Sequence, residues 1–155
     1  MTTDVDPAGT GAVITAVLHG HPDIAGALDA VHRASWAAVD QRLLELCRVR
    51  VAQLLGCDEE ADALTPGVAV TADELASVST WPTASCFGAG DRAVLAWCEQ
   101  FVIDVAAMDD STVAPVRDHL GDGGLIDLTN ALLVIEQRQR LRLTWMRLLG
   151  VRTSG

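Results

Sequence analysis

The chain has 155 residues, of which half are apolar, and its 21 acidic and 11 basic residues give a formal net charge of −10. Such a surface repels nucleic acids and anionic membranes, because binding to either depends on clustered cations. Every basic residue is an arginine, so lysine Schiff-base chemistry is excluded as well.

Length and hydropathy predict one globular domain. A chain of this size can bury a substantial core, and no apolar run approaches the roughly 20 residues that span a bilayer. The first segment, MTTDVDPAGTG, is acidic and lacks the basic region of a signal peptide. We therefore expect a loose tail over residues 1–10, a single domain over residues 11–155 and a cytoplasmic location.

Two helices are predicted before residue 40. The first covers about residues 11–18 and ends at a His-Gly-His-Pro break, since proline disfavours helix in the residue before it. His19 and His21 in this break are more typical of a turn than of a metal site, and no metal or cofactor is predicted. In the second helix, residues 23–38, apolar side chains share one face: Ile24, Leu28, Val31 and Ala34.

A long helix followed by a short acidic helix is predicted within residues 40–64. The long helix carries a wide apolar stripe formed by Leu43, Leu44, Cys47, Val51, Leu54 and Leu55. A second strip holds Glu45 among small residues that let another backbone approach. Glu45 is therefore expected to be partly buried and to pair with Arg48. The long helix ends at Gly56, and Cys57 opens the acidic helix.

The remaining segments also show helical patterns. Thr71 and Glu74 form a capping box at the start of one helix. A further helix opens at Asp91 and carries the stripe Val94, Cys98, Phe101 and Val105. A short helix from Ser111 and a last helix over residues 122–149 complete the chain. Because no alternating strand pattern or hairpin turn is found, the sequence predicts an all-α fold.

Five consecutive polar residues, Glu136 to Arg140, interrupt the apolar pattern of the last helix. We favour a solvated turn or a subunit contact, because charge runs are usually solvated. The alternative is that these residues form the polar wall of a pocket.

Four cysteines occur, and none of them forms a C-x-x-C pair or a zinc-binding spacing. Cys47 and Cys98 lie on apolar stripes and are expected in the core. Cys86 lies in a loop, and the sequence assigns it no partner. All four are expected to be reduced thiols.

The run RVRVAQLLGC, followed by an acidic helix, resembles the alkylhydroperoxidase D-like / carboxymuconolactone decarboxylase family. Peroxidase members carry a similar run, a C-x-x-C-x-x-x-H motif and a glutamate twelve residues before the first cysteine. Glu45 and Cys57 match this glutamate and this cysteine. Glu60 stands at the second cysteine and Leu64 at the histidine. The chain is thus most similar to a C-x-x-E branch, over roughly residues 20–150.

The resemblance implies an alkylhydroperoxidase D-like helical bundle with a degenerate site formed by Glu45, Cys57 and Glu60. One function is an enzyme with residual thiol peroxidase or acid–base activity at these residues. The alternative is a non-catalytic protein that binds a small molecule or builds a homo-oligomer. A carboxymuconolactone decarboxylase-like lyase is a weaker third option, because no acid/base histidine is evident near the site.

The chemistry of the motif positions argues against efficient peroxidase turnover. A thiol peroxidase needs a thiolate and a second thiol that resolves the sulfenic acid, and Glu60 cannot form a disulfide with Cys57. Two nearby carboxylates share a proton unless an arginine lies between them. Glu45 and Glu60 are therefore expected to form either an acid–base pair or a structural pair bridged by Arg48.

We predict a homo-oligomer that is dimeric or trimer-based. Half of the residues are apolar, and the last helix carries two apolar stripes that one small domain would struggle to cover. Members of the resembled family also usually associate. Sedimentation velocity at micromolar concentration should show a mass above the 16.4 kDa of one chain. A single species at the monomer mass would contradict this prediction.

Overall fold

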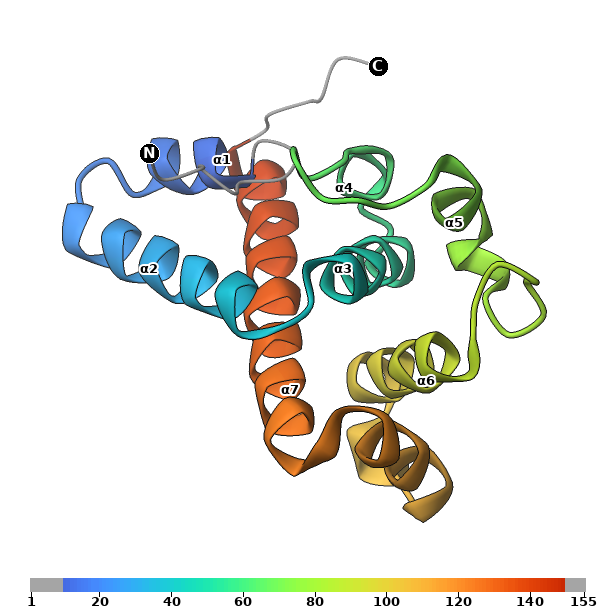
Figure 1. Ribbon diagram of the computed structural model, residues 1–155. Helices are drawn as coiled ribbons and strands as arrows, with labels where there is room; N and C mark the ends of the chain where they lie inside the picture. The colour runs from blue at the N-terminus through green and yellow to red at the C-terminus, as the bar shows by residue number, and fades with distance from the viewer. Residues whose placement is uncertain (1–9, 150–155) are drawn as a thin grey trace.

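The computed structural model describes residues 10–149, which form seven α-helices, two short 3₁₀-helices and no β-strand (Figure 1). The all-α prediction is confirmed. In chain order the elements are α1 (Thr10–Val17), α2 (Pro22–Ala38), α3 (Gln41–Leu55), α4 (Asp58–Asp62), α5 (Ala72–Ser77), η2 (Val78–Thr80), α6 (Ala89–Ile103), η3 (Val105–Ala107) and α7 (Asp110–Leu149). Thr10, placed in the predicted tail, begins α1, and the rest of that tail lies outside the described residues.

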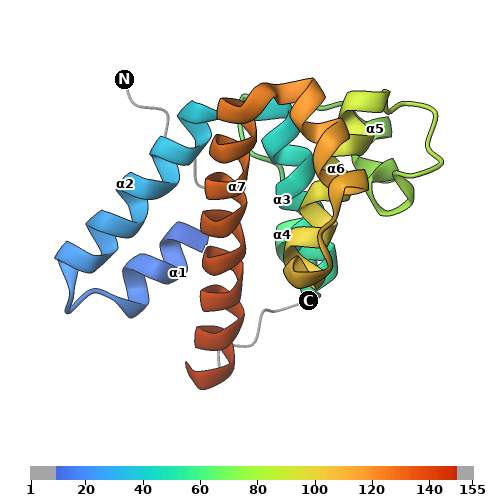
Figure 2. The same cartoon turned by 90° about the horizontal axis from the view of Figure 1, so that it is seen from below.

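Helices α3 and α7 form the centre of the fold. Helices α1 and α2 lie on one side of α7, and α3 to α6 lie on the other (Figure 2). The main core is built between α2, α3, α6 and α7 from residues such as Trp36, Leu44, Cys47, Val51, Cys98 and Leu132. A second cluster, formed between α3, η2 and α6, contains Leu46, Val49, Val78, Phe87 and Leu95. The predicted burial of Cys47 and Cys98 in the core is confirmed.

Local signals fix both ends of α3. At its start, the Asp40 carboxylate accepts a hydrogen bond from the backbone N–H of Leu43 at 3.0 Å. At its end, Gly56 has a φ of 69°, a left-handed conformation that glycine adopts without a Cβ clash. The backbone N–H of Cys57 then donates to the carbonyl of Ala52 at 2.8 Å. This turn brings α4 back against α3 (Figure 1).

Helix α2 presents its predicted apolar face to the outside. Ile24 and Val31 are 52% and 45% exposed, whereas the buried side of α2 holds His32, Ser35 and Trp36. Periodicity locates an apolar face correctly but does not determine which way it points. The inward side of α2 tolerates His32 because that side chain lines a polar cavity.

Boundaries around α6 and α7 differ from the predicted ones. Helix α6 ends at Ile103, so Val105 does not continue its apolar stripe and is 60% exposed in η3. The helices predicted from Ser111 and over residues 122–149 are joined as α7, with a kink at Gly121, whose φ is 72°. Within residues 10–149 we find no helix with the length and apolar character that a membrane crossing needs.

Candidate functional site

A buried ion-pair cluster lies where α1, α3, α4 and α7 meet, and its central residue is Arg48. The Arg48 guanidinium donates to both carboxylate oxygens of Glu45, at 2.8 and 2.9 Å, and to a carboxylate oxygen of Glu60 at 3.2 Å. It also donates to the backbone carbonyls of Glu60 and Ala63, both at 2.5 Å. A guanidinium has five N–H groups, and these five hydrogen bonds use all of them. Arg48 is 2% exposed and is therefore a fixed bridge between the two carboxylates.

Glu45 is saturated with hydrogen-bond donors. Besides the two bonds from Arg48, its oxygens accept from the backbone N–H of Thr65 at 2.9 Å and from the Thr65 hydroxyl at 2.6 Å. Burial alone would raise the pKa of Glu45, but the bonds and charge of Arg48, together with Thr65, outweigh it and lower that pKa below its ordinary value. Glu45 is therefore held as a carboxylate, and the shared-proton alternative does not apply to it.

Glu60 connects the cluster to the first and last helices. Its carboxylate accepts from the Arg142 guanidinium of α7 at 3.2 Å and from the Thr10 hydroxyl of α1. Arg142 also forms an ion pair with Glu59. Glu60 is fully buried, so these contacts replace the water that an ionised carboxylate would otherwise need. The cluster thus joins the consecutive helices α3 and α4 to α1 and α7, which lie near the two ends of the chain.

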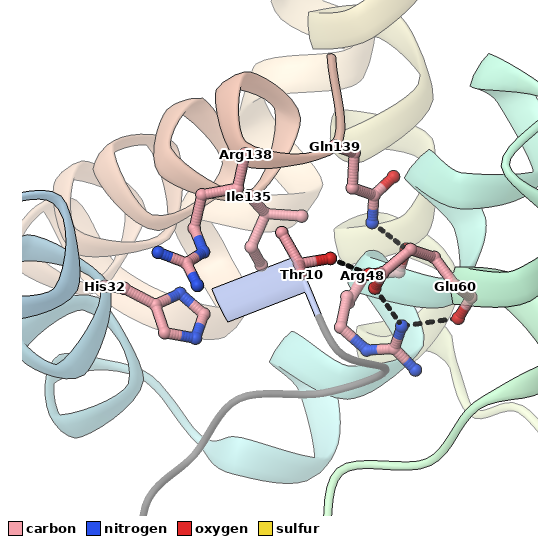
Figure 3. A pocket seen from close by; sticks show the side chains of 7 residues that line it. All are labelled: Thr10, His32, Arg48, Glu60, Ile135, Arg138 and Gln139. Carbon is pink, nitrogen blue, oxygen red and sulfur yellow. Dashed lines mark hydrogen bonds and ion pairs between the residues drawn. The ribbon is translucent and has the colours of Figure 1, made fainter. Parts of the chain in front are cut away.

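A small cavity opens beside this cluster. Its volume is about 10 Å³, which is roughly the room that one water molecule needs. It is lined by Thr10, His32, Arg48, Glu60, Ile135, Arg138 and Gln139 (Figure 3). In this view His32 and Arg138 are drawn at one end of the group, and Arg48 and Glu60 are drawn at the other. The Gln139 amide donates to the backbone carbonyl of Arg48 at 3.1 Å. Six of the seven lining residues are polar or charged, and both signs of charge are present among them.

Cys57 occupies the N-cap position of α4, without a side-chain capping bond, and lines a different hollow. This hollow has a volume of about 170 Å³ and also touches Arg142, Leu143 and Met146. The thiol is buried, and burial is the main cause that raises its pKa above the ordinary value of 9.0. The charges of Glu60 and Glu59 raise the pKa further, while Arg142 and a hydrogen bond from the Glu60 backbone oppose the change. A thiol in this setting is a weak nucleophile.

The three predicted site residues are brought together only in part. Glu45 and Glu60 are joined through Arg48, which is the arginine-bridged arrangement. Neither the 10 Å³ cavity nor the 170 Å³ hollow is lined by all three residues, and Glu45 lines neither of them. Among residues 10–149, no three His, Cys, Asp or Glu side chains gather closely enough to hold a metal ion.

Several residues of the cluster and of the small cavity beside it were not expected from the sequence. His32 and Thr10 come from segments without a site motif, so no local signal pointed to them. The favoured interpretation of residues 136–140 as solvated is wrong for two of the five. Arg138 and Gln139 are buried and line the cavity, while Glu136 and Arg140 pair nearer the surface at 2.7 Å. One sequence signal could have indicated the burial of Arg138. Arg138 and Arg142 are four residues apart, which places both on one helix face.

Fold and site together define an all-α protein of the alkylhydroperoxidase D-like class in which ion pairs occupy the place of the redox motif. The model of the carboxymuconolactone decarboxylase family matches residues 22–100, and the chain belongs to this family. The resemblance found in the sequence is thus confirmed.

One solved structure shares the fold. It is a crystal structure of a protein of unknown function from Agrobacterium tumefaciens that has been suggested to be the antioxidant defence protein AhpD. The two chains are 15% identical and superpose with a TM-score of 0.72 over 90% of this chain and 96% of that one. Identity at this level establishes the common fold alone. No match was found among curated proteins.

Replacing Arg48 by methionine should destabilise the protein by about 3–5 kcal/mol, because Glu45 and Glu60 would remain buried without their shared cation. Arg50→Met is the matched control, since Arg50 lies on the same helix and its pair with Glu99 is partly exposed. The control should lose about 1 kcal/mol or less. Urea unfolding followed by circular dichroism measures both, and equal losses would refute the structural role of the Arg48 bridge.

Replacing Glu45 by glutamine should weaken the dependence of stability on acid pH. The folded-state pKa of Glu45 lies below its ordinary value of 4.5. Its carboxylate therefore contributes stability that is fully present above about pH 4.5 and is lost as the pH falls through the folded-state pKa. Between roughly pH 5 and pH 3 the unfolding free energy of the wild type should fall more steeply than that of the variant. Parallel curves would show that Glu45 does not contribute.

Proposed function

We propose that this protein is a small-molecule-binding member of its family without thiol peroxidase activity. The observation that carries the proposal is the saturation of Glu45, whose oxygens accept four hydrogen bonds from Arg48 and Thr65. A carboxylate has about four lone-pair sites. The glutamate at the family position therefore has no site left with which to accept a proton from a thiol or a substrate.

The thiol chemistry of the chain supports the same conclusion. Reduction of a hydroperoxide converts an attacking thiolate to a sulfenic acid, and a second thiol must then displace water to form a disulfide. Cys57 is buried with a raised pKa. The other three cysteines belong to the two apolar cores, Cys47 and Cys98 to the main one and Cys86 to the second. None of them lines the hollow beside Cys57.

Binding is supported by the spaces that adjoin the ion-pair cluster. The buried ion pairs join α3, α4 and α7, and the Thr10 hydroxyl joins α1 to them, beside the small cavity and the 170 Å³ hollow. Walls that are ordered before the ligand arrives reduce the entropy lost on binding. A rigid polar cluster therefore suits a receptor for a small molecule better than it suits proton transfer through Glu45.

Acid–base catalysis at Glu60 is the second candidate, and the position of His32 favours it. His32 lines the same small cavity as Glu60, so the cavity holds the histidine that the sequence did not reveal. A histidine and a carboxylate on one cavity suit general acid–base work, including that of a lyase. The cavity holds only about one water molecule, so a substrate would enter only after α1 moves away from Glu60.

Self-association is proposed as well. Ile24 and Val31 form an exposed apolar face on α2, and Ile126 and Leu133 are exposed on α7. Apolar surface of this kind is a common subunit contact. Val31→Glu places a charge on this face of α2 and should weaken association. If the variant sediments as the wild type does, α2 is not part of the subunit interface.

Cumene hydroperoxide with a dithiol reductant should be turned over more slowly than about 1 per second, because Cys57 is poorly ionised and has no resolving thiol. Cys57→Ser should show the same residual rate as the wild type. A faster rate that the substitution abolishes would overturn the proposal.

Ligand binding is tested separately from turnover. In a nuclear magnetic resonance screen of small polar organic molecules, at least one compound should shift backbone amide signals around the described cavities. Absence of any shift at roughly 10 mM compound would exclude even the weak affinities expected of such probes, and would refute the binding function. Substrate turnover that is lost in His32→Gln would instead support the acid–base candidate.

A further inference from the structure

The largest of the cavities considered lies away from the family motif. It is a hollow of about 600 Å³ between α1 and α2, with α7 as its floor. The two helices leave a common turn and diverge toward α7 (Figure 2). Gly11, Ala12 and Ala16 of α1 and Ala25 of α2 face the gap, and such small side chains leave it unfilled. Its volume falls within the range of small-molecule pockets, about 300–1,000 Å³.

Arg138 forms the floor of this hollow. It is 5% exposed and lines both the hollow and the small cavity beside Glu60. Figure 3 shows it among the residues of the small cavity. An arginine is always charged, and its planar fork binds a carboxylate through two parallel bonds. Its five donors can serve several acceptors at once, as Arg48 does for Glu45, Glu60 and Ala63.

The other residues that line the hollow determine which chemical groups of a ligand can lie beside its anionic group. Ile14 and Ala25 offer apolar surface, and Thr15 offers a hydroxyl. The acidic wall residue, Asp29, forms an ion pair with Arg33, which compensates its charge. An apolar wall with an arginine at its base fits a molecule that has one carboxylate and a short apolar body.

We propose that the hollow between α1 and α2 binds a small organic carboxylate, with the carboxylate on Arg138 and the apolar body against Ile14 and Ala25. This proposal rests on the small-molecule-binding function above and names its site and ligand class. It separates the binding site from the positions of Glu45, Cys57 and Glu60. The polar run of residues 136–140 then supplies, through Arg138, the specificity for the anion.

The first test is an amide-signal titration of the full-length protein with benzoate, benzyl alcohol and inorganic phosphate. Benzoate should shift signals of residues that line the hollow. Benzyl alcohol lacks the charge and should bind at least about tenfold more weakly, since a charge-assisted pair contributes that much. Phosphate keeps the charge but lacks the apolar body, and it should also bind at least about tenfold more weakly because it buries no apolar surface. Equal binding of benzoate and benzyl alcohol, or benzoate shifts confined to other regions, would overturn the proposal.

Two matched pairs of variants complete the test. Arg138→Gln should weaken benzoate binding at least about tenfold, whereas Arg140→Gln, on the same helix but exposed, should bind as the wild type does. Ala25→Leu places a larger side chain in the hollow, away from the ion-pair cluster, and should abolish benzoate binding. Ala27→Leu, exposed on α2 and outside the hollow, is its control.

The outcomes separate this proposal from the function on which it rests. Undiminished benzoate binding in Ala25→Leu refutes the proposed site even if Arg138→Gln does not fold. If other compounds bind at the polar cavity or beside Cys57 while benzoate does not bind, the hollow is not the site and the binding function stands. If no compound binds anywhere, both proposals fail.

Discussion

The burial of the Arg48 guanidinium is the constraint on which the rest of this structure depends. A buried cation is tolerated only when its charge is compensated and its donors are all used. Glu45, one turn earlier on the same helix, supplies two acceptors, and the chain after Gly56 must supply the other three. The left-handed turn at Gly56 and the shortness of α4 follow from this requirement, because the carbonyls of Glu60 and Ala63 have to reach back to α3.

The same cluster accounts for the environments of Glu60 and Leu64. Once Glu60 stands at the second cysteine position it needs cations, and Arg48 and Arg142 supply them. Ala63 and Thr65 turn their polar groups toward the cluster, so Leu64 between them points outward and is 53% exposed. A histidine at that position would therefore lie outside the cluster. The burial of Glu60 and the exposure of Leu64 are thus two consequences of one arrangement of the chain after Gly56.

Sequence patterns anticipated the features that depend on neighbours along the chain. Helical periodicity gave the helices, the Thr71–Glu74 capping box is formed, and the spacing of Glu45 and Arg48 indicated their pair. Patterns failed where the outcome depended on distant segments. Nothing near His32 indicates that α2 turns it inward, because its environment is made by α1 and α7. Arg138 was misassigned for the same reason, since burial of a charge run depends on partners from other helices.

The ion-pair cluster also accounts for the hollow between α1 and α2. Thr10 fixes the first turn of α1 to Glu60 and Arg142, while the far end of α1 is held to α2 by the short turn before Pro22. Three of the five α1 residues that line the hollow are glycine or alanine, and these small residues leave space between two helices anchored in this way. The arginines of α7 then divide their roles along one helix face: Arg142 closes the cluster, and Arg138, one turn earlier, lies between the cluster and the hollow. The interactions that saturate the motif positions therefore also keep a second space beside them open, with a buried cation at its base.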